Sequence, residues 1–499
     1  MARGISGSTR GRARHQHQHQ HQHRTVNDRR QLALTLLVAG TFFMENLDGT
    51  ILATAAPTIG RAYGVDSATV GVAITAYLVT LAVLIPISGW LTQRLGARVV
   101  FTGAIAVFTV ASVLCAASTD LVQLTAMRVL QGAGGAMMVP VGRLAVLRVT
   151  EKKDLVRAIA WLTWPALAAP IVAPLVGGLL VTYASWHWIF LLNVPLGAVA
   201  FVAALRLTPR ELDRQRVPLD WLGFALTFTG VGAVVVFGAL LSDPAAPAAA
   251  TIAAGVAGAV LTGWAILHLL RAAHPLLDLR AFRIETFRVT HAGGSLFRLT
   301  ISAVPFLLPL FFQDALGWSP VQAGAIVLTL FVGNLVIKPA TTPLLVRWGF
   351  RRVLVASTAG AVLSMVLAAF IAPFTPIAFV VVLLVFSGMT RSTGFTAYNT
   401  IAFADVPAEE MTAANTLAST VQQIAAGLGV AVGAVALRFG EPLAAWTGLQ
   451  EPAGAYRIAF VLIAVLALGS VVEAVRLSPA AGDNIRPPRR RVSAPSAPR

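Results

Sequence analysis

The segment Arg94–Arg98 reads RLGAR, and Arg347–Arg351 repeats the pattern as RWGFR. Each segment follows a long apolar stretch and opens another, after the second and after the tenth apolar stretch of the chain. Two six-helix bundles with two extra helices between them would produce this offset, and many secondary transporters consist of such repeats. A chance R-x-G-x-R match in arginine-rich loops is the alternative, but the matching positions favour a repeat.

The composition around these segments is that of a membrane protein. Of the 499 residues, 57% are hydrophobic and only 12% are charged, whereas about a quarter of the residues of a soluble domain are charged. Apolar stretches of roughly 20 residues recur along the chain, which is the length needed to cross a hydrocarbon core of ~30 Å. We therefore predict an all-α polytopic membrane protein.

Fourteen apolar stretches can be delimited as spans, and their even number places both termini on one side of the membrane. The stretches are residues 32–57, 68–91, 99–118, 121–147, 156–182, 187–207, 219–241, 250–271, 289–312, 321–345, 352–372, 377–401, 412–436 and 456–476. The loops after even-numbered spans hold most of the arginines, so the positive-inside rule predicts that both termini are cytoplasmic. These loops and the tails also account for the formal net charge of +17, so we expect no nucleic-acid partner.

The spans divide the chain into five parts. We expect a disordered cytoplasmic tail, an N-terminal six-helix bundle, a linker with two accessory helices, a C-terminal six-helix bundle and a disordered basic tail: residues 1–31, 32–207, 208–288, 289–476 and 477–499. The His-Gln run from His15 to His23 could bind metal, but we interpret it as part of a tail without a role. Lysine is scarce beside arginine, which suggests a high-GC genome and thus a bacterial inner membrane. The single cysteine, Cys115, excludes an intrachain disulfide.

Two acids lie in the middle of the first span. Glu45 and Asp48 are three residues apart and so share one helical face. An ionised side chain costs about 2.5–3.5 kcal/mol at the centre of a membrane helix, so both carboxyls should face a cavity or a partner. A carboxyl in this setting can bind and release a proton, which is what proton coupling requires, and a structural ion pair is the alternative.

Two arginines lie in the fourth span. Arg128 cannot deprotonate, so it could pair with an acid of the first span and modulate how readily that acid binds a proton. Arg143 is nearer the inner surface, and we expect it to snorkel to the interface.

The fifth span holds a proline and glycine cluster. Pro170 and Pro174 each remove a backbone donor and bend the helix, and Gly177 and Gly178 allow close packing. A helix of this kind can act as a gate, although single prolines and glycines are ordinary in membrane helices.

The second half adds basic groups at membrane depth. If Arg298, Lys338 and Arg391 line the same cavity as the acids, an anionic or zwitterionic substrate is expected. Lys338 could instead lie near a helix break, and Arg391 could pair with a backbone carbonyl. Met137 and Tyr398 could add an adaptable apolar binding surface, or simply pack between helices.

Motifs for other chemistry are missing from the sequence. No lysine ends a G-x-x-x-x-G-K-[ST] loop, and no H-E-x-x-H pair occurs. We therefore expect neither an ATP-driven motor of this kind nor an enzyme, and no cofactor or metal.

Together these motifs resemble the major facilitator superfamily, and within it the fourteen-span drug:proton antiporters of the EmrB/QacA type. The likeness covers about residues 32–476. It rests on Leu47–Thr50, which matches L-D-x-T, on the loop Gly89–Arg98, on Arg128–Gly132, which matches R-x-x-Q-G, and on the opening of the sixth span at Trp186–Pro195.

The resemblance also assigns a role to the first loop. In such families Gly89, Arg94, Gly96 and Arg98 belong to a loop that locks the inner gate, and we expect the same role here. Gln93 stands where the family has an aspartate, which removes a charge that the family is thought to use in this lock.

Two other stretches complete the comparison. The segment Gly135–Arg143, with Arg298 and Lys338, is similar to MdtD-like exporters. The family's fifth span usually reads Gly-Pro twice, whereas residues 169–174 read Ala-Pro twice, which loosens the packing.

The residues and the resemblance together predict a secondary transporter in the lipid bilayer. We expect a monomer that exchanges protons for small amphipathic compounds by alternating access. An exporter of small organic anions is the first alternative, and a membrane sensor or scaffold without transport is the second.

Overall fold

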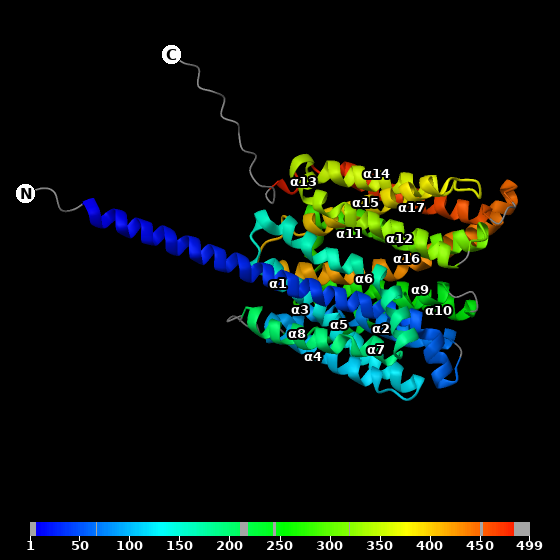
Figure 1. Ribbon diagram of the computed structural model, residues 1–499, viewed down its shortest axis with the longest axis horizontal. Coiled ribbons are helices and arrows are strands. Elements are labelled where there is room, and N and C mark those ends of the chain that lie inside the picture. Colours follow the sequence, from blue (N-terminus) through cyan, green and yellow to red (C-terminus); the bar gives the residue numbers. More distant parts are fainter. Residues whose placement is uncertain are drawn as a thin grey trace, which may run out of the picture.

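Long helices run side by side along one direction of the molecule (Figure 1). The computed structural model describes residues 6–65, 67–209, 218–242, 246–318, 320–449 and 453–483. The first half consists of α1 (Ser6–Tyr63), α2 (Ser67–Leu84), α3 (Ile87–Leu95), α4 (Ala97–Ala116), α5 (Leu121–Val149), the 3₁₀ turn η1 (Lys152–Asp154), α6 (Leu155–Tyr183), α7 (His187–Leu191) and α8 (Asn193–Leu207). Next come α9 (Trp221–Ser242), α10 (Ala248–Arg271) and the 3₁₀ turn η2 (Leu279–Arg283). The second half consists of α11 (Glu285–Leu310), its π-helical end η3 (Phe311–Ala315), α12 (Pro320–Val336), α13 (Lys338–Trp348), α14 (Phe350–Ala368), α15 (Ile377–Ile401), α16 (Met411–Thr447) and α17 (Gly454–Arg476).

Many of these helices can cross a membrane. In the described part of the chain, ten helices are long and apolar enough, or up to twelve spans if each of two bent helix pairs counts as one. The pair α2 and α3 bends by 59°, and the pair α12 and α13 by 49°. The prediction of an all-helical polytopic protein is therefore confirmed, with ten to twelve candidate spans, and the count of fourteen stays a prediction.

The helices of the two halves pair in the same way. In the first half α1 packs on α6, α2 and α4 pack on α5, and α4 packs on α8. In the second half α11 packs on α16, α12 and α14 pack on α15, and α14 packs on α17. Each half has its own apolar cluster, around Phe101 and Phe108 in the first and around Phe311 and Phe460 in the second. The repeat that the two R-x-G-x-R segments predict is thus present in the packing.

The central glycine of each repeated segment has the same backbone conformation. Gly96, between α3 and α4, has φ 87° and ψ 147°, and Gly349, between α13 and α14, has φ 81° and ψ 162°. This region of positive φ strains residues with a Cβ atom. The repeated glycine is therefore required where each bent helix pair turns into the next helix. We call the end of the molecule that carries these two turns the arginine-rich end.

Replacing Gly96 or Gly349 by alanine is expected to destabilise the protein, because positive φ with ψ near 150° is a region that essentially only glycine occupies and costs about 1–3 kcal/mol for other residues. The midpoint of thermal unfolding in detergent measures this effect. Gly103→Ala is the matched control, because Gly103 lies inside α4 and no atom lies within 4 Å of the added Cβ. A drop in the midpoint as large for Gly103→Ala as for Gly96→Ala would contradict this account of the turns.

The first helix differs from the sequence prediction. We expected residues 1–31 to be disordered, whereas α1 begins at Ser6 and projects beyond the bundle (Figure 1). The stretch before residue 57 contains no proline, and it is rich in arginine and glutamine, which favour helices. Most of the predicted basic tail, residues 484–499, lies outside the described residues.

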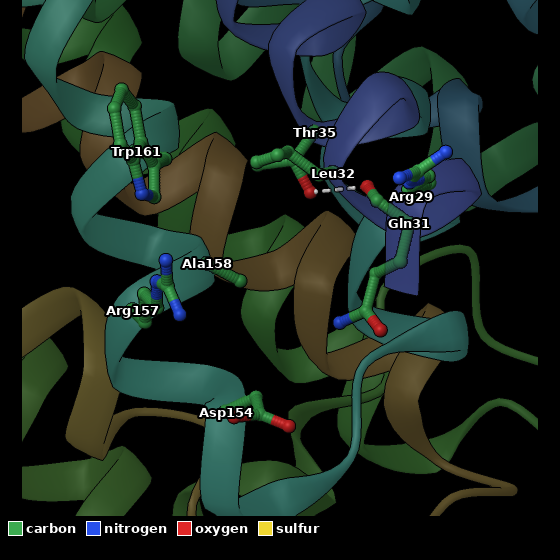
Figure 2. Close-up of a pocket in the computed structure, with 8 residues that line it drawn as sticks. All are labelled: Arg29, Gln31, Leu32, Thr35, Asp154, Arg157, Ala158 and Trp161. Carbon is green, nitrogen blue, oxygen red and sulfur yellow. Dashed lines mark hydrogen bonds between the residues drawn. The ribbon is translucent and has the colours of Figure 1, made fainter. Parts of the chain in front are cut away.

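Helices α1 and α6 pack against each other and leave a groove at the arginine-rich end (Figure 2). Accessory helix α9 packs on α2 and α16, where the two halves meet. At the same junction α16 contacts α2, α3 and α5, and α6 contacts α12, α13 and α15. Helices α6 and α16 therefore form much of the contact between the halves, and both line the central cavity described below.

Candidate functional site

Asp48 of α1 and Arg128 of α5 form a buried ion pair. Arg128 Nη1 lies 2.5 Å from Asp48 Oδ2, and neither side chain is exposed to solvent. Arg128 also stacks on the ring of Tyr77 from α2, with 4.0 Å between the guanidinium carbon and the ring centroid. The sequence suggests Arg128 as a possible partner for an acid of the first span, and the structure places it against Asp48.

Three polar side chains complete the surroundings of Asp48. Gln131 Nε2 and Asn193 Nδ2 donate to Asp48 Oδ1 at 2.9 and 2.7 Å, and Gln131 Oε1 accepts from Arg128 Nη1 at 2.7 Å. Gln131 also donates to Ser112 Oγ at 2.8 Å. A buried carboxylate is costly unless its charge is paired and hydrogen-bonded, and here both conditions are met. The site joins α1, α4, α5 and α8, so a change of charge at Asp48 acts on four helices at once.

Sequence reasoning missed part of this network. Asn193 and Gln131 stood in motifs that carried the family resemblance, but no role was assigned to them. Ser112 and Tyr77 lie in apolar stretches without a distinctive pattern. Helical spacing could have placed Gln131 beside Arg128, since the two are three residues apart.

Glu45 lies between this ion pair and a cavity. Its Oε2 is buried and has no hydrogen-bond partner among the described residues, as is also true of the Tyr77 hydroxyl. Both groups lie near Gly135 of α5, because a Cβ at that position would be 3.7 Å from Glu45 Cδ and 3.4 Å from the Tyr77 hydroxyl. Glu45 and Tyr77 are therefore neighbours, and Tyr77 in turn stacks on Arg128.

The cavity has a volume of about 260 Å³ and lies between the two halves. Glu45, Arg143 and Arg298 are its charged lining residues in the described part of the chain, and they come from α1, α5 and α11. Apolar side chains such as Phe42, Leu162 and Phe395 and uncharged polar ones such as Asn46, Ser302 and Gln423 line the remainder. A small, mostly apolar cavity with a few charged groups suits an amphipathic molecule.

Arg298 is held at one wall of this cavity. Its Nη2 donates to Asn399 Oδ1 at 3.1 Å, and its guanidinium carbon lies 5.7 Å from the centre of the Phe395 ring. Its Nε is buried and has no partner among the described residues. One donor of Arg298 is therefore buried without a partner in the described part of the chain.

Arg143 does not snorkel, contrary to the expectation from its position. It is 8% exposed, and its Nε donates to Asn415 Oδ1 at 2.7 Å. Its Nη2 donates to Ser419 Oγ at 2.5 Å and its Nη1 to Gln422 Oε1 at 3.3 Å. All three partners lie on α16 of the other half, so Arg143 closes the cavity towards the arginine-rich end.

Neighbouring contacts extend this closure. Arg148 Nη2 donates to Thr412 Oγ1 at 2.6 Å, and Asn415 Nδ2 donates to the Pro140 carbonyl at 2.9 Å. Gly89 of α3 packs directly against Thr416, so that a Cβ at this position would overlap the threonine. Helix α16 is thus fastened to α3 and α5 of the first half.

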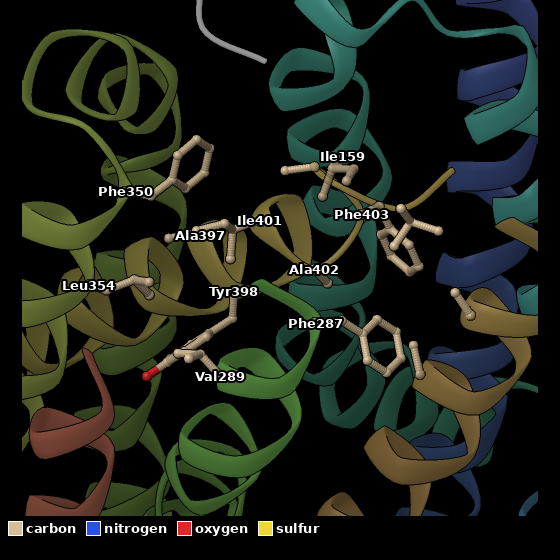
Figure 3. Packing of buried hydrophobic residues seen from close by; sticks show 14 of the residues in the cluster. Ile159, Phe287, Val289, Phe350, Leu354, Ala397, Tyr398, Ile401, Ala402 and Phe403 are labelled. Carbon is tan, nitrogen blue, oxygen red and sulfur yellow. The ribbon is translucent and has the colours of Figure 1, made fainter. Parts of the chain in front are cut away.

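The other proposed cavity residues lie elsewhere. Lys338 is buried at the bend before α13, where its Nζ donates to Thr163 Oγ1 of α6 and Thr396 Oγ1 of α15 at 3.1 and 2.8 Å. Arg391 is buried in α15 and is not among the lining residues of the cavity. Met137 and Tyr398 belong to apolar clusters, and Figure 3 shows Tyr398 among Val289, Leu354 and Ile401. Both side chains lie on helix faces that pack inside one half of the molecule. A sequence pattern alone does not determine which neighbours such a face contacts.

The remaining gate residues are placed as follows. Arg94 stacks over Trp90 of its own helix at 5.4 Å, and Arg98 donates to the carbonyl oxygen of Leu205, which joins α4 to α8. A Cβ at Gly177 of α6 would lie 3.0 Å from Ile51 of α1, whereas Gly178 has open space. The side chains of Pro170 and Pro174 lie outside the described residues, although α6 is helical through both positions.

A helical membrane protein with two repeated halves around a charged cavity has the architecture of a secondary transporter. The family model of the Major Facilitator Superfamily matches residues 38–279 and 290–498. The chain belongs to the major facilitator superfamily, whose members are membrane transporters and not enzymes. It is a multi-pass protein of the bacterial cell membrane.

Several relatives carry the provisional name multidrug resistance protein MdtD. The chain is 38% identical to that of Cronobacter sakazakii over 404 residues, which cover 80% of this chain and 85% of the relative. It is 37% identical to that of Escherichia coli strain SMS-3-5 over 409 residues, with the same shares covered. The crystal structure of the human organic anion transporter MFSD10 superimposes with a TM-score of 0.60 at 14% identity, over 88% of this chain and 99% of that one. That likeness shows the fold alone.

Proposed function

We propose that this protein exports small amphipathic compounds in exchange for protons. The observation that carries the proposal is the buried Asp48 and Arg128 pair, 2.5 Å apart, beside a cavity that Glu45 lines. Buried ionisable groups in membrane helices are expensive and mark ion or proton pathways by default. The name of the MdtD relatives supports multidrug compounds as the cargo.

The proposal includes fourteen spans with cytoplasmic termini. Ten helices and two bent pairs account for twelve spans. The long helices α6 and α16, of 29 and 37 residues, would supply the other two. The arginine-rich end is then cytoplasmic by the positive-inside rule, and the bonds of Arg143 to α16 close the cavity on the cytoplasmic side.

Proton exchange would act through the charge of Asp48. When Asp48 takes up a proton, Arg128 loses its counter-charge and the four helices around the pair lose a common anchor. Glu45 and Tyr77 connect this pair with the cavity, so they are the groups through which the proton and the cargo would influence each other. Opening of the cytoplasmic side then requires that α16 leave Arg143 and Arg148.

A second candidate cargo is a small organic anion. Two arginines and one acid line the cavity, so the cavity is positive even when Glu45 is ionised. The unpartnered Nε of Arg298 is a donor that suits a carboxylate.

Charge-removing variants distinguish the two cargo classes. For amphipathic cations, Glu45→Gln is expected to weaken binding about tenfold or more, because a charged hydrogen bond contributes about 1.5–3 kcal/mol. Arg298→Gln is then expected to leave cation binding unchanged or stronger. Binding of a fluorescent lipophilic cation to purified protein, with aromatic carboxylates as competitors, measures both effects. Loss of carboxylate competition in Arg298→Gln, with cation binding unaffected by Glu45→Gln, would favour the organic anion instead.

A further inference from the structure

The groove between α1 and α6 at the arginine-rich end is separate from the central cavity. It has a volume of about 290 Å³ and contains Arg29, Leu32 and Thr35 of α1 together with Arg157 and Trp161 of α6. Ala158 and Trp161 line the groove, whereas Ile159 and Leu162 line the central cavity. The two hollows therefore lie on different faces of α6, and the transport cycle proposed above does not use the groove.

The polar part of the groove is positively charged. Figure 2 shows Arg29 and Arg157 on opposite sides of the groove, one from each helix. Both are exposed, and neither has a hydrogen-bond or ion-pair partner among the described residues. Asp154 is a nearby acid that lines the groove, and Lys152 lies two residues before it in η1. Two guanidiniums that line one hollow, without partners among the described residues, are suited to a phosphate.

Two other polar side chains of the groove, Gln31 and Thr35, already bond within the protein. Thr35 Oγ1 donates to the Gln31 carbonyl at 2.9 Å (Figure 2), and Gln31 Nε2 donates to Thr150 Oγ1 at 3.2 Å. The second bond links Gln31 of α1 to Thr150, the residue that follows α5. The groove therefore has a fixed shape, and it contains two cationic side chains, Arg29 and Arg157, without partners among the described residues.

The apolar part of the groove continues along the outer face of both helices. Leu32 and Leu36 of α1 are 44% and 47% exposed, and Trp161 and Trp164 of α6 are 42% and 43% exposed. Residues three or four apart share a helical face, so each pair forms a continuous apolar strip. Tryptophan is enriched where the acyl chains meet the headgroups. A ligand with a phosphate and long acyl chains would match both parts at once, whereas a soluble phosphate would match only the arginines.

We propose that this groove binds an anionic phospholipid. Arg29 and Arg157 would hold the headgroup phosphate, and the acyl chains would lie along Leu32, Leu36, Trp161 and Trp164. With the orientation proposed above, the lipid belongs to the cytoplasmic leaflet. It bridges α1, which carries Asp48, and α6, which contacts the second half.

The test is whether phosphatidylglycerol binds to the full-length protein in detergent. Native mass spectrometry measures the amount of bound lipid, and the midpoint of thermal unfolding measures the stabilisation that the lipid gives. Phosphatidylglycerol is expected to bind at least tenfold more tightly than phosphatidylcholine and to raise the midpoint. The double variant Arg29→Ala with Arg157→Ala is expected to lose about thirtyfold in affinity, because each basic residue near an anionic surface contributes about 1 kcal/mol and about 1.4 kcal/mol corresponds to a factor of ten. Glycerol phosphate, which has the headgroup chemistry without acyl chains, should not compete at millimolar concentration.

The matched control is Arg271→Ala with Arg288→Ala, which removes the same charge from exposed positions on α10 and α11. Unfolding midpoints without lipid show whether each variant is folded. The proposal is overturned if both double variants lose affinity equally, if phosphatidylcholine binds as tightly, or if glycerol phosphate displaces the lipid. None of these outcomes depends on transport. A failure of the lipid proposal therefore does not contradict the proposed antiport, which flux measurements test separately.

Discussion

Asp48→Asn is expected to abolish proton-driven export and to leave downhill exchange of cargo in place. Asparagine has nearly the same shape, and its one oxygen can accept from Arg128 or from Gln131 but not from both, and it cannot carry the proton. Accumulation of cargo in inside-out vesicles, driven by an imposed pH difference, should fall by about a hundredfold or more. Glu409→Gln, which removes an exposed carboxyl, should have no effect.

A double variant separates coupling from stability. Asp48→Asn leaves Arg128 charged and buried, and breaking a buried pair on one side costs about 3–5 kcal/mol. Adding Arg128→Gln removes the stranded charge, so the midpoint of thermal unfolding should recover while proton-driven export stays lost. Recovery of export in the double variant would mean that the pair is structural, as the alternative reading of the sequence held.

Arg143→Ala is expected to open the cytoplasmic side of the cavity. The substitution removes the hydrogen bonds to Asn415, Ser419 and Gln422 of α16. Each bond contributes about 1 kcal/mol, so the balance between closed and open states should shift at least tenfold, since about 1.4 kcal/mol corresponds to a factor of ten.

The opening can be measured by labelling a cysteine placed in the cavity. In a Cys115→Ser background, Gln423→Cys reports access, because Gln423 lines the cavity. A membrane-impermeant maleimide applied to the cytoplasmic side of inside-out vesicles should react at least tenfold faster in Arg143→Ala. Arg206→Ala, which removes an exposed arginine of α8, is the control. Equal labelling rates of Gln423→Cys alone, with Arg143→Ala and with Arg206→Ala would show that Arg143 does not keep the cytoplasmic side of the cavity closed.

The sequence predicted most of the fold because the relevant signals are local. Hydropathy indicates spans, and the glycine of R-x-G-x-R marks the turn at Gly96 and Gly349. The charged residues Asp48 and Arg128 were found because isolated charges in apolar stretches are conspicuous. The sequence suggested that Arg128 pairs with an acid of the first span, but that this acid is Asp48 and not Glu45 depends on how α1 and α5 face each other, which a single sequence does not contain.

The residues whose positions the sequence did not predict have the same explanation. Arg143 binds Asn415, which lies 272 residues further along the chain, so its burial follows from tertiary packing and not from its depth in the span. Tyr398 and Met137 carry apolar surface that suits a cavity and a packed core equally well. The chemistry of the site was therefore readable from the sequence, whereas the lining of the cavity required the structure.

In the proposed cycle, cargo and protons move in opposite directions through one protein. Proteoliposomes with a trapped pH-sensitive dye, loaded with cargo and diluted into cargo-free buffer at equal pH, test it directly. Our account predicts that outflow of cargo through the wild-type protein acidifies the interior, and that Asp48→Asn abolishes this acidification while cargo exchange continues. Outflow of cargo through the wild-type protein without any change of internal pH would contradict the account.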